Sequence, residues 1–378
     1  MKRHLIIAAA TLGGAALLGG LVATAGFIPI AASSGHFALT EWLLVFSKER
    51  AVSTQARGVT LPRLDDPTLV LRGAGHFETA CRPCHGAPDL PRQPRVARAM
   101  LPPPPNLSER APQWEPEELF FIVKNGIKFT GMPAWPSQVR DDEVIAVVAF
   151  LRELPQLDAT TYTELVHGPG GARQNQHAGT PPRQPPPSEP LVSLASHEPA
   201  PRAVQISCGR CHGIDGQGRG TPAFPALAGQ KREYLVAALE AYASDRRQSG
   251  LMQPAAAALS REAMHEVAAY YSRLPPRSPR QPSDPAAVER GRTLADMGDE
   301  ARRVPSCSDC HGPGPETRSA YAPRLAGQYP EYLELQLRLF AEKHRGGSEH
   351  AELMAFVTPG LTHERMHDAA QYYASVAP

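Results

Sequence analysis

Three copies of one short pattern contain every cysteine of this 378-residue sequence. The stretch "CRPCHG" at 81–86 returns as "CGRCHG" at 208–213 and as "CSDCHG" at 307–312. Two cysteines separated by two residues and followed by a histidine are typical of c-type haem attachment. The thiols lie one helical turn apart, so both can add to the vinyl groups of one porphyrin, and the histidine then lies under the iron. The predicted attachment residues are Cys81, Cys84, Cys208, Cys211, Cys307 and Cys310.

Two other uses of paired cysteines need a context that this sequence lacks. A zinc site would need a second pair of ligands for each cysteine pair. A thioredoxin-like redox pair would need a surrounding βαβ pattern. We therefore predict three covalently bound haem c groups, each with one iron.

Each motif histidine predicts one axial ligand of an iron, and the other ligand decides whether that iron carries electrons or binds substrates. The three histidines are His85, His212 and His311. A methionine follows each histidine at a comparable distance, in a loop between predicted helices. A thioether ligand favours ferrous iron and raises its potential. The predicted methionine ligands are Met132, Met252 and Met354.

Further methionines and histidines recur in register between the second and third units. Met264 and Met366 repeat inside an amphipathic helical pattern, which favours core packing over ligation. His265 and His367 follow them directly, and their neighbours favour a position on a helix surface or between helices.

Prolines after each motif are candidates to fix the ligating histidines. A ligating histidine usually donates its second N–H to a carbonyl, which sets the orientation of the ring. Pro225 and Pro323 align between the second and third units and could offer that carbonyl. In the first unit Pro103, Pro104 and Pro105 are equivalent candidates.

The second and third units repeat one plan of elements. "PALAGQKREYL" at 225–235 corresponds to "PRLAGQYPEYL" at 323–333, and "MHEVAAYYS" at 264–272 corresponds to "MHDAAQYYA" at 366–374. Apolar residues recur at helical spacing after each LAGQ. The pattern predicts helix, haem loop, helix, methionine loop and helix, and the fold class is all-α.

Local details complete this plan. Ser260 and Thr362 are expected to cap the last helix of each copy. The segment before Cys208 is proline-rich and too short for a full first helix, so the second haem is expected to be more exposed or differently covered. The first unit has predicted helices over about 69–80 and around 119–123, and a last helix that begins at Asp141 or Asp142. Its methionine lies in "GMPAWP" at 131–136, where the prolines favour a rigid loop.

The N-terminus predicts a membrane segment. Two basic residues at positions 2–3 precede an uncharged, mainly apolar run over 5–32. A membrane-spanning helix needs about 20 apolar residues, and a signal peptide has a shorter apolar region. The small residues at 23–25 would fit a signal cleavage site, so an anchor and a cleaved signal both remain open. Either places the rest of the chain in the bacterial periplasm, beyond the inner membrane.

Composition divides the chain into six segments. The stretch "HGPGGARQNQHAGTPPRQPPPSEP" at 167–190 predicts a disordered linker that lets the later units swing outward. The connector over 275–285 is much shorter, so the second and third units are expected to pack together. The predicted segments are an anchor or signal over 1–35, a juxtamembrane segment over 36–68, a first cytochrome c domain over 69–154, a Pro/Gly-rich linker over 155–203, and further cytochrome c domains over 204–275 and 284–378.

Within the juxtamembrane segment, the stretch 36–49 places Leu39, Trp42, Leu43 and Phe46 on one helical face. Two interpretations remain open for this face. It packs on the first haem domain, or it lies in the membrane interface, where Trp is favoured, or against a membrane partner.

The motifs carry a family resemblance over most of the chain. Residues 204–378 resemble the tandem dihaem cytochromes of bacterial respiratory chains, the c-four group, through CxxCHG, P-x-LAGQ-x-x-x-YL and a methionine followed at eight residues by Ser or Thr. Residues 69–154 resemble a single class I cytochrome c of the "GMPAW" kind. The resemblance implies small all-helical cytochrome c folds with His/Met haems that shuttle electrons without bond chemistry.

These features predict an electron carrier rather than an enzyme. We expect a membrane-anchored trihaem cytochrome that passes electrons from a quinol-oxidising complex towards a terminal oxidase, a soluble carrier or another cytochrome. The alternative is the cytochrome c subunit of a membrane-bound alcohol or sugar-acid dehydrogenase. A haem enzyme would need an open iron position, against which the three methionines argue. A formal net charge of +1 without a basic stripe argues against nucleic acid.

Overall fold

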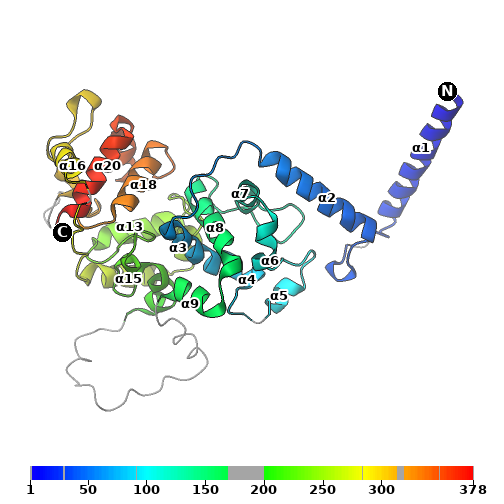
Figure 1. Ribbon diagram of the computed structural model, residues 1–378, viewed down its shortest axis with the longest axis horizontal. Coiled ribbons are helices and arrows are strands. Elements are labelled where there is room, and N and C mark those ends of the chain that lie inside the picture. The colour runs from blue at the N-terminus through cyan, green and yellow to red at the C-terminus, as the bar shows by residue number, and fades with distance from the viewer. Residues whose placement is uncertain are drawn as a thin grey trace, which may run out of the picture.

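The computed structural model describes residues 2–28, 30–90, 92–168, 200–282, 284–312, 319–348 and 350–377. Within these ranges the regular structure is helical, apart from one isolated β bridge between Asp299 and Val304. The all-α prediction is therefore confirmed. The molecule is elongated, with the N-terminal helices projecting from one end and the C-terminus at the other (Figure 1).

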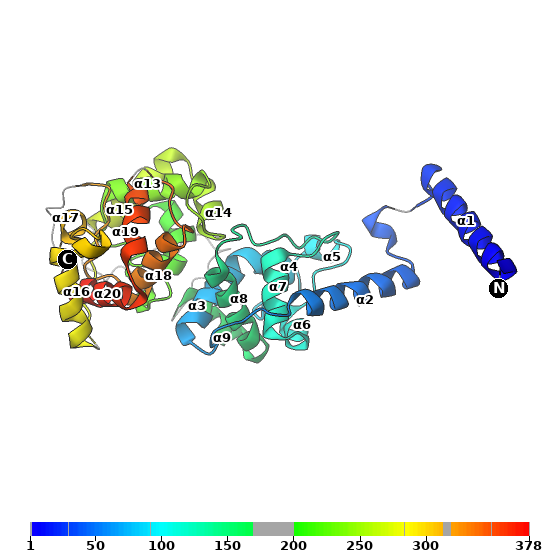
Figure 2. The same ribbon diagram turned by 90° about the horizontal axis from the view of Figure 1, so that it is seen from above.

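Two helices precede the folded body. Helix α1 (Lys2–Thr24) is long and apolar enough to cross a membrane, by length and composition alone, and it makes no contact that buries it. It ends before the predicted apolar run does, at Thr24 rather than Ala32. A 3-10 turn, η1 (Ala32–Ser34), leads to α2 (Ala38–Gln55), which reaches the body at its C-terminal end (Figure 2).

The first unit, residues 67–167, is built on a crossing of two helices. Helix α3 (Pro67–His76) begins after Asp66, whose side chain accepts the N–H of Thr68, and it packs against α8 (Asp141–Glu153). Gly73 makes the close approach possible, because a Cβ there would overlap the carbonyl oxygen of Ala146. The other elements are η2 (Phe77–Cys81), α4 (Arg82–His85), α5 (Arg95–Arg98), α6 (Leu107–Arg110), η3 (Ala111–Gln113), α7 (Pro116–Asn125), η4 (Leu154–Gln156) and α9 (Ala159–His167).

Helix α9 corrects the predicted start of the linker at residue 155. Asp158 caps it by accepting the N–H of Thr161, and its Tyr162 and Val166 are fully buried in the core of the first unit. The Tyr162 hydroxyl donates a 2.6 Å hydrogen bond to buried Glu78. The proline-rich stretch that follows concealed this short amphipathic helix. Most of the predicted linker, 169–199, lies outside the described residues.

The second unit, residues 204–273, and the third unit, residues 285–375, follow the repeated plan. The predicted N-caps are confirmed: Ser260 accepts the N–H of Ala263, and Thr362 accepts the N–H of Arg365. The second unit contains η5 (Val204–Cys208), α12 (Gly209–His212), η6 (Gly218–Gly220), α13 (Arg232–Ala243), α14 (Met252–Ala257) and α15 (Arg261–Arg273). The third contains α16 (Pro285–Met297), η7 (Glu300–Arg302), α17 (Ser308–His311), α18 (Pro330–Ala341), α19 (Ala351–Val357), η8 (Thr358–Gly360) and α20 (His363–Ser375).

The second and third units pack together, as predicted, through the glutamines of their LAGQ segments. The Gln230 side chain donates to the carbonyl of Arg324 at 3.0 Å and accepts its N–H at 2.8 Å. The Gln328 side chain donates to the carbonyl of Ala226 at 2.9 Å and accepts its N–H at 3.0 Å. Both glutamines are buried. The same sequence position in the two copies therefore makes reciprocal contacts across the interface.

The first unit also packs on the second, which corrects the predicted swinging arrangement. Arg219 donates to the carbonyl of Val166 at 2.9 Å, and Leu71 of α3 packs against Phe224. Helix α3 lies beside the second unit in both views (Figures 1 and 2). The sequence did not indicate this interface because it joins residues that are far apart in the chain, 53 positions in the case of Arg219 and Val166.

Candidate haem sites

The three motifs fold into the same local structure. Each is a single helical turn, α4, α12 or α17, that ends at the motif histidine. The next residue is a glycine with positive φ: Gly86 at 76°, Gly213 at 78° and Gly312 at 66°. A residue without a Cβ adopts this conformation at little cost, so the chain can turn away directly after the histidine. The six cysteines form no disulfide, and all of their thiols remain free for thioether formation.

Proline carbonyls orient the three histidines. Nδ1 of His212 lies 3.0 Å from the carbonyl oxygen of Pro225, and Nδ1 of His311 lies 2.9 Å from that of Pro323, which confirms both predicted pairs. In the first unit Nδ1 of His85 lies 2.9 Å from the carbonyl oxygen of Pro105. The sequence could not distinguish among three adjacent prolines, and the structure identifies Pro105 as the one that contacts the histidine.

The carbonyl contacts determine the tautomer. A carbonyl oxygen can only accept, so each Nδ1 carries the proton and each Nε2 keeps the lone pair that a metal ligand needs. Burial lowers the pKa of all three imidazoles, which favours the neutral form that binds metals. The donor set therefore fits an axial position of a haem iron.

The candidate methionines are positioned differently from one another. Met132 lies in a loop, as predicted, but Met252 is the first residue of α14 and Met354 lies inside α19. All three side chains are half-buried, whereas Met264 and Met366 are buried in the core at 6% and 3% exposure. The assignment of the last two to core packing is confirmed.

The recurring histidines after the core methionines are not buried ligands. His265 is exposed on α15. Nδ1 of His367 lies 3.2 Å from a carboxylate oxygen of Glu334 on α18, so His367 joins two helices. The predicted helix-surface and interhelix positions are therefore confirmed.

Two hydroxyl groups that were not predicted as site residues accept the backbone N–H groups of the first two candidate methionines. The Thr130 hydroxyl accepts the N–H of Met132 at 3.1 Å, and the Ser249 hydroxyl accepts the N–H of Met252 at 3.1 Å. The signal was available in the sequence, because a Thr or Ser precedes both methionines by two or three residues.

A cluster of cations between the second and third units also fits a haem. Arg247 is buried, and Arg345, which stands at the corresponding position of the third unit, donates to the Tyr234 hydroxyl at 3.1 Å. Burial alone would raise the pKa of Tyr234, but the two guanidinium groups lower it to about 8. The other contacts of the two arginines are with uncharged groups: Arg345 donates to the side chain of Gln336 at 2.6 Å, and the Arg247 guanidinium lies 4.5 Å from the centre of the Tyr242 ring. Buried charge needs compensation, and the propionates of a haem would supply it.

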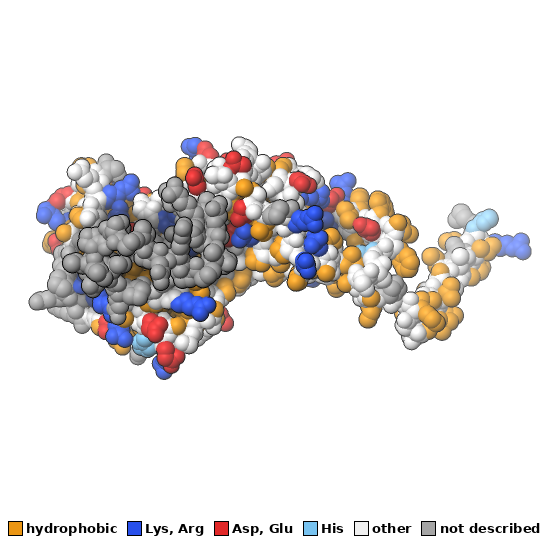
Figure 3. Space-filling view, turned by 90° about the horizontal axis from the view of Figure 1, so that it is seen from below, with side chains coloured by type: hydrophobic (Ala, Val, Ile, Leu, Met, Phe, Trp, Pro, Cys, Tyr) orange, Lys and Arg blue, Asp and Glu red, His pale blue; other side chains and the backbone are white. Residues whose placement is uncertain are grey.

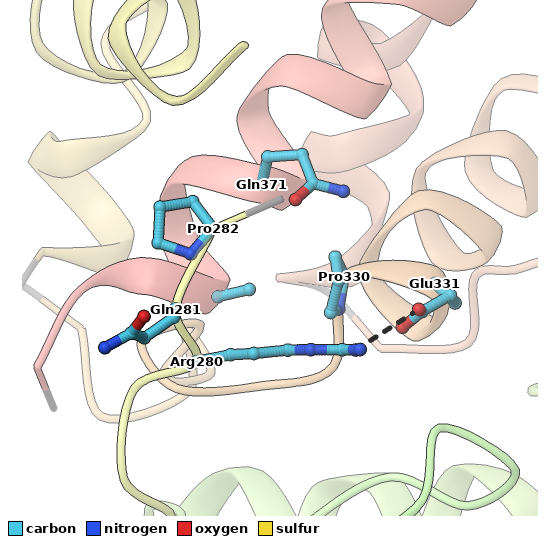
Figure 4. Close-up of a pocket in the computed structure, with 7 residues that line it drawn as sticks. Arg280, Gln281, Pro282, Pro330, Glu331 and Gln371 are labelled. Atoms are coloured by element: carbon cyan, nitrogen blue, oxygen red, sulfur yellow. Dashed lines mark hydrogen bonds and ion pairs between the residues drawn. The ribbon is translucent and has the colours of Figure 1, made fainter. Parts of the chain in front are cut away.

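No other site in the described part of the chain competes with the motifs. It holds no further group of three or more His, Cys, Asp or Glu side chains that could hold a metal ion. Figure 4 shows a small pocket of about 50 Å³ beside α18 and α20, where Arg280 lies 3.4 Å from Glu331. It has room for a few water molecules rather than for a substrate.

Comparison with known families identifies two of the three units. The family described as cytochrome c oxidase, cbb3-type, subunit III matches residues 68–151, and the cytochrome c family matches residues 199–274.

Individual relatives cover nearly half of the chain. A protein of Stutzerimonas stutzeri named thiosulfate dehydrogenase electron acceptor is 35% identical over 178 residues, which are 45% of this chain and 79% of that protein. Cytochrome c4 of Pseudomonas aeruginosa is 30% identical over 183 residues, 48% of this chain and 90% of that protein. The solved structure of Acidithiobacillus ferrooxidans cytochrome c4 has 32% sequence identity to this chain. The match covers 45% of this chain and 98% of the cytochrome c4 chain, with a TM-score of 0.40.

Proposed function

Because this chain belongs to the multihaem c-type cytochromes related to cytochrome c4, and is therefore an electron carrier, we propose that it holds three haem c groups. In this proposal they pass electrons along a periplasmic respiratory chain. The observation that supports the number three is the repetition of one geometry, a motif turn followed by a histidine whose Nδ1 faces a proline carbonyl. Bound haem c supplies a one-electron Fe(III)/Fe(II) couple.

The roles of the residues follow from this geometry. The paired cysteines of each motif would form the thioether links to a haem, and Nε2 of each motif histidine would be a ligand of its iron. The thioethers of Met132, Met252 and Met354 would be the further ligands. An iron held by both residues would have no position open for a substrate, so the three sites would serve electron transfer.

We assign the N-terminal region to the membrane. Helix α1 spans it, with its basic end on the cytoplasmic side. On α2 the side chains of Leu39, Trp42 and Phe46 are 75%, 61% and 46% exposed, and only the C-terminal end of α2 reaches the first unit, where Ser53 donates to Glu118 at 2.5 Å. Figure 3 shows hydrophobic side chains gathered over both helices. The apolar face of α2 then lies in the membrane interface next to the anchor.

Two sources of electrons are candidates. The first is a quinol-oxidising complex at the membrane, with a terminal oxidase, a soluble carrier or another cytochrome as the acceptor. The second is a dehydrogenase, which the relative named thiosulfate dehydrogenase electron acceptor favours. In that case this chain would receive electrons as a partner or subunit of a dehydrogenase.

Membranes that contain the full chain can separate the two sources. Reduction of the haems is followed by visible absorbance after addition of a quinol or of thiosulfate, each with and without an inhibitor of quinol oxidation. We expect reduction by quinol that the inhibitor blocks. Reduction by thiosulfate alone would support the dehydrogenase pathway, and failure of both donors to reduce any haem would contradict the proposed function.

A further inference from the structure

A buried carboxylate connects the first two units. Glu143, in the first turn of α8, is 3% exposed. It accepts the indole N–H of Trp135 at 3.0 Å, the hydroxyl of Ser249 at 2.6 Å and the N–H of Gly250 at 2.7 Å. Trp135 follows Met132 by three residues in the first unit, and Ser249 and Gly250 precede Met252 by three and two residues in the second. One side chain therefore contacts both methionine segments.

The charge of Glu143 is compensated inside the interface. Nη2 of Arg140 lies 3.1 Å from Oε1 of Glu143, and Nη1 of Arg140 donates to the carbonyl of Gln248 at 2.8 Å. Ser137 adds a 3.1 Å hydrogen bond to the side chain of Gln248. A buried ion pair whose lone pairs are satisfied by further donors is hard to disrupt, because removal of one partner leaves an uncompensated charge.

The connection extends to the backbone of the candidate ligand. The Ser249 hydroxyl, which donates to Glu143, also accepts the N–H of Met252 at 3.1 Å. The indole of Trp135 lies directly on Gly250, where a Cβ would overlap the ring. The position of the Met252 segment is therefore set by groups of the first unit.

A second contact lies at the motif turns. Arg210, inside the second motif, donates to the hydroxyl of Thr79, two residues before the first motif. Cys211 and Phe224 pack with Leu71 of α3, and a Cβ on Gly75 would lie 2.9 Å from the Phe224 ring. Two separate contacts fix the relative orientation of two bodies far better than one, so the first unit cannot pivot on the second while both persist.

We propose that Glu143 is a positioning residue that fixes the first haem unit to the second and holds the Met132 and Met252 segments in one geometry. With haem c bound at both motifs, this contact would keep the two units at a constant separation, and haem c would supply the one-electron couple through which one site is oxidised as the other is reduced. This inference rests on the proposed function, in which both methionines are axial ligands.

The test compares variants of the full haem-loaded chain. Glu143→Ala removes the shared acceptor, and Ser249→Ala removes only the hydroxyl between Glu143 and Met252. Ser348→Ala is the matched control, because the hydroxyl of this serine accepts the N–H of Ala351 at 3.2 Å, three residues before Met354, and so serves the methionine segment of the third unit. Far-ultraviolet circular dichroism confirms that each variant is folded.

Hydrogen–deuterium exchange of the backbone amides is the first measurement. Hydrogen bonds to a charged group contribute enough that their loss should speed exchange in 248–253 roughly 10-fold or more in Glu143→Ala. A smaller acceleration is expected in Ser249→Ala, and none in Ser348→Ala. Unchanged exchange in 248–253 in both Glu143→Ala and Ser249→Ala would overturn the proposal.

Potentiometric titration is the second measurement and separates this inference from the proposed function. We expect the midpoint potentials of two haems to shift in Glu143→Ala while the third stays constant. If exchange in 248–253 accelerates and all three potentials stay constant, the contact exists but does not position the ligands, and the positioning role is overturned. If the parent protein lacks three haem waves altogether, the proposed function itself fails.

Discussion

At the scale of the residue, the chemistry depends on how each imidazole is presented. The proline carbonyls at Pro105, Pro225 and Pro323 hold the Nδ1 protons of three histidines, which leaves one lone pair per ring. The contacts of His212 with Pro225 and of His311 with Pro323 could be predicted from the sequence. The two prolines recur at the same position of the second and third units, and a residue that recurs in this way has the same structural role in both copies. The first unit offered three adjacent prolines, and only the folded loop distinguishes them.

Substitution of the candidate methionines tests the second ligand. The resemblance to His/Met cytochromes implies a weak far-red absorption band from a thioether–iron bond in the oxidised protein. Met132→Ala, Met252→Ala and Met354→Ala should each remove one of three contributions to this band, measured by absorbance of the ferric protein. Met264→Leu is the control, since it replaces a buried side chain by one of similar volume and should leave the band intact at a cost below about 1.5 kcal/mol. An undiminished band in all three alanine variants would contradict the ligand assignment.

At the scale of the element, the differences between prediction and structure lie in the short helices. Periodicity predicted α3, α8, α15 and α20, whose apolar faces repeat over three turns. It missed α9, a nine-residue helix bordered by a proline-rich stretch, and it placed Met252 and Met354 in loops although they belong to short helices. Helices of this length are stabilised by tertiary packing rather than by intrinsic propensity. Sequence periodicity alone therefore cannot locate them.

The role of α9 can be tested through its buried tyrosine. Tyr162→Phe removes the hydrogen bond to Glu78 and leaves a buried carboxylate with one donor fewer. We expect a loss of about 1–3 kcal/mol in the free energy of unfolding of the first unit, measured by denaturant titration. Tyr321→Phe, at a half-exposed ring, should change this free energy by less than about 0.5 kcal/mol. Equal stabilities of the two variants would show that α9 does not belong to the core.

The apolar face of α2 gives a second prediction at this scale. Trp42 and Phe46 stack on each other at 5.5 Å between ring centroids and remain largely exposed. Replacement of both by Ser should slow quinol-dependent reduction in membranes, while reduction of the purified protein by a soluble donor and its stability stay unchanged. Loss of stability together with unchanged reduction by quinol would instead assign this face to the core of the first unit.

At the scale of the whole molecule, the three units form one row rather than a body with a tethered arm. Reciprocal glutamines join the second and third units, and Glu143 joins the first and second. The short connector after residue 275 predicted the first of these interfaces. The interface between the first and second units could not be predicted, because the sequence around Glu143 indicates only an acidic residue in the first turn of a helix. Only its contacts with a distant segment reveal its burial.

The attachment of this row to the membrane is also testable. If α1 is an uncleaved anchor, the full chain stays in the membrane fraction in high salt, because burial of about 20 apolar residues is not an ionic attachment. N-terminal sequencing of the mature protein should then include Lys2 and Arg3. A mature chain that begins at Gly26 would show that this segment is a cleaved signal.

The number of haems tests the central claim most directly. The intact mass of the full chain, measured under denaturing conditions that retain thioether bonds, is compared with the mass of the polypeptide. We predict a difference of three haems, with all six cysteines resistant to a thiol-alkylating reagent. A difference of two haems or fewer, together with alkylation of the cysteines of any motif, would contradict the account.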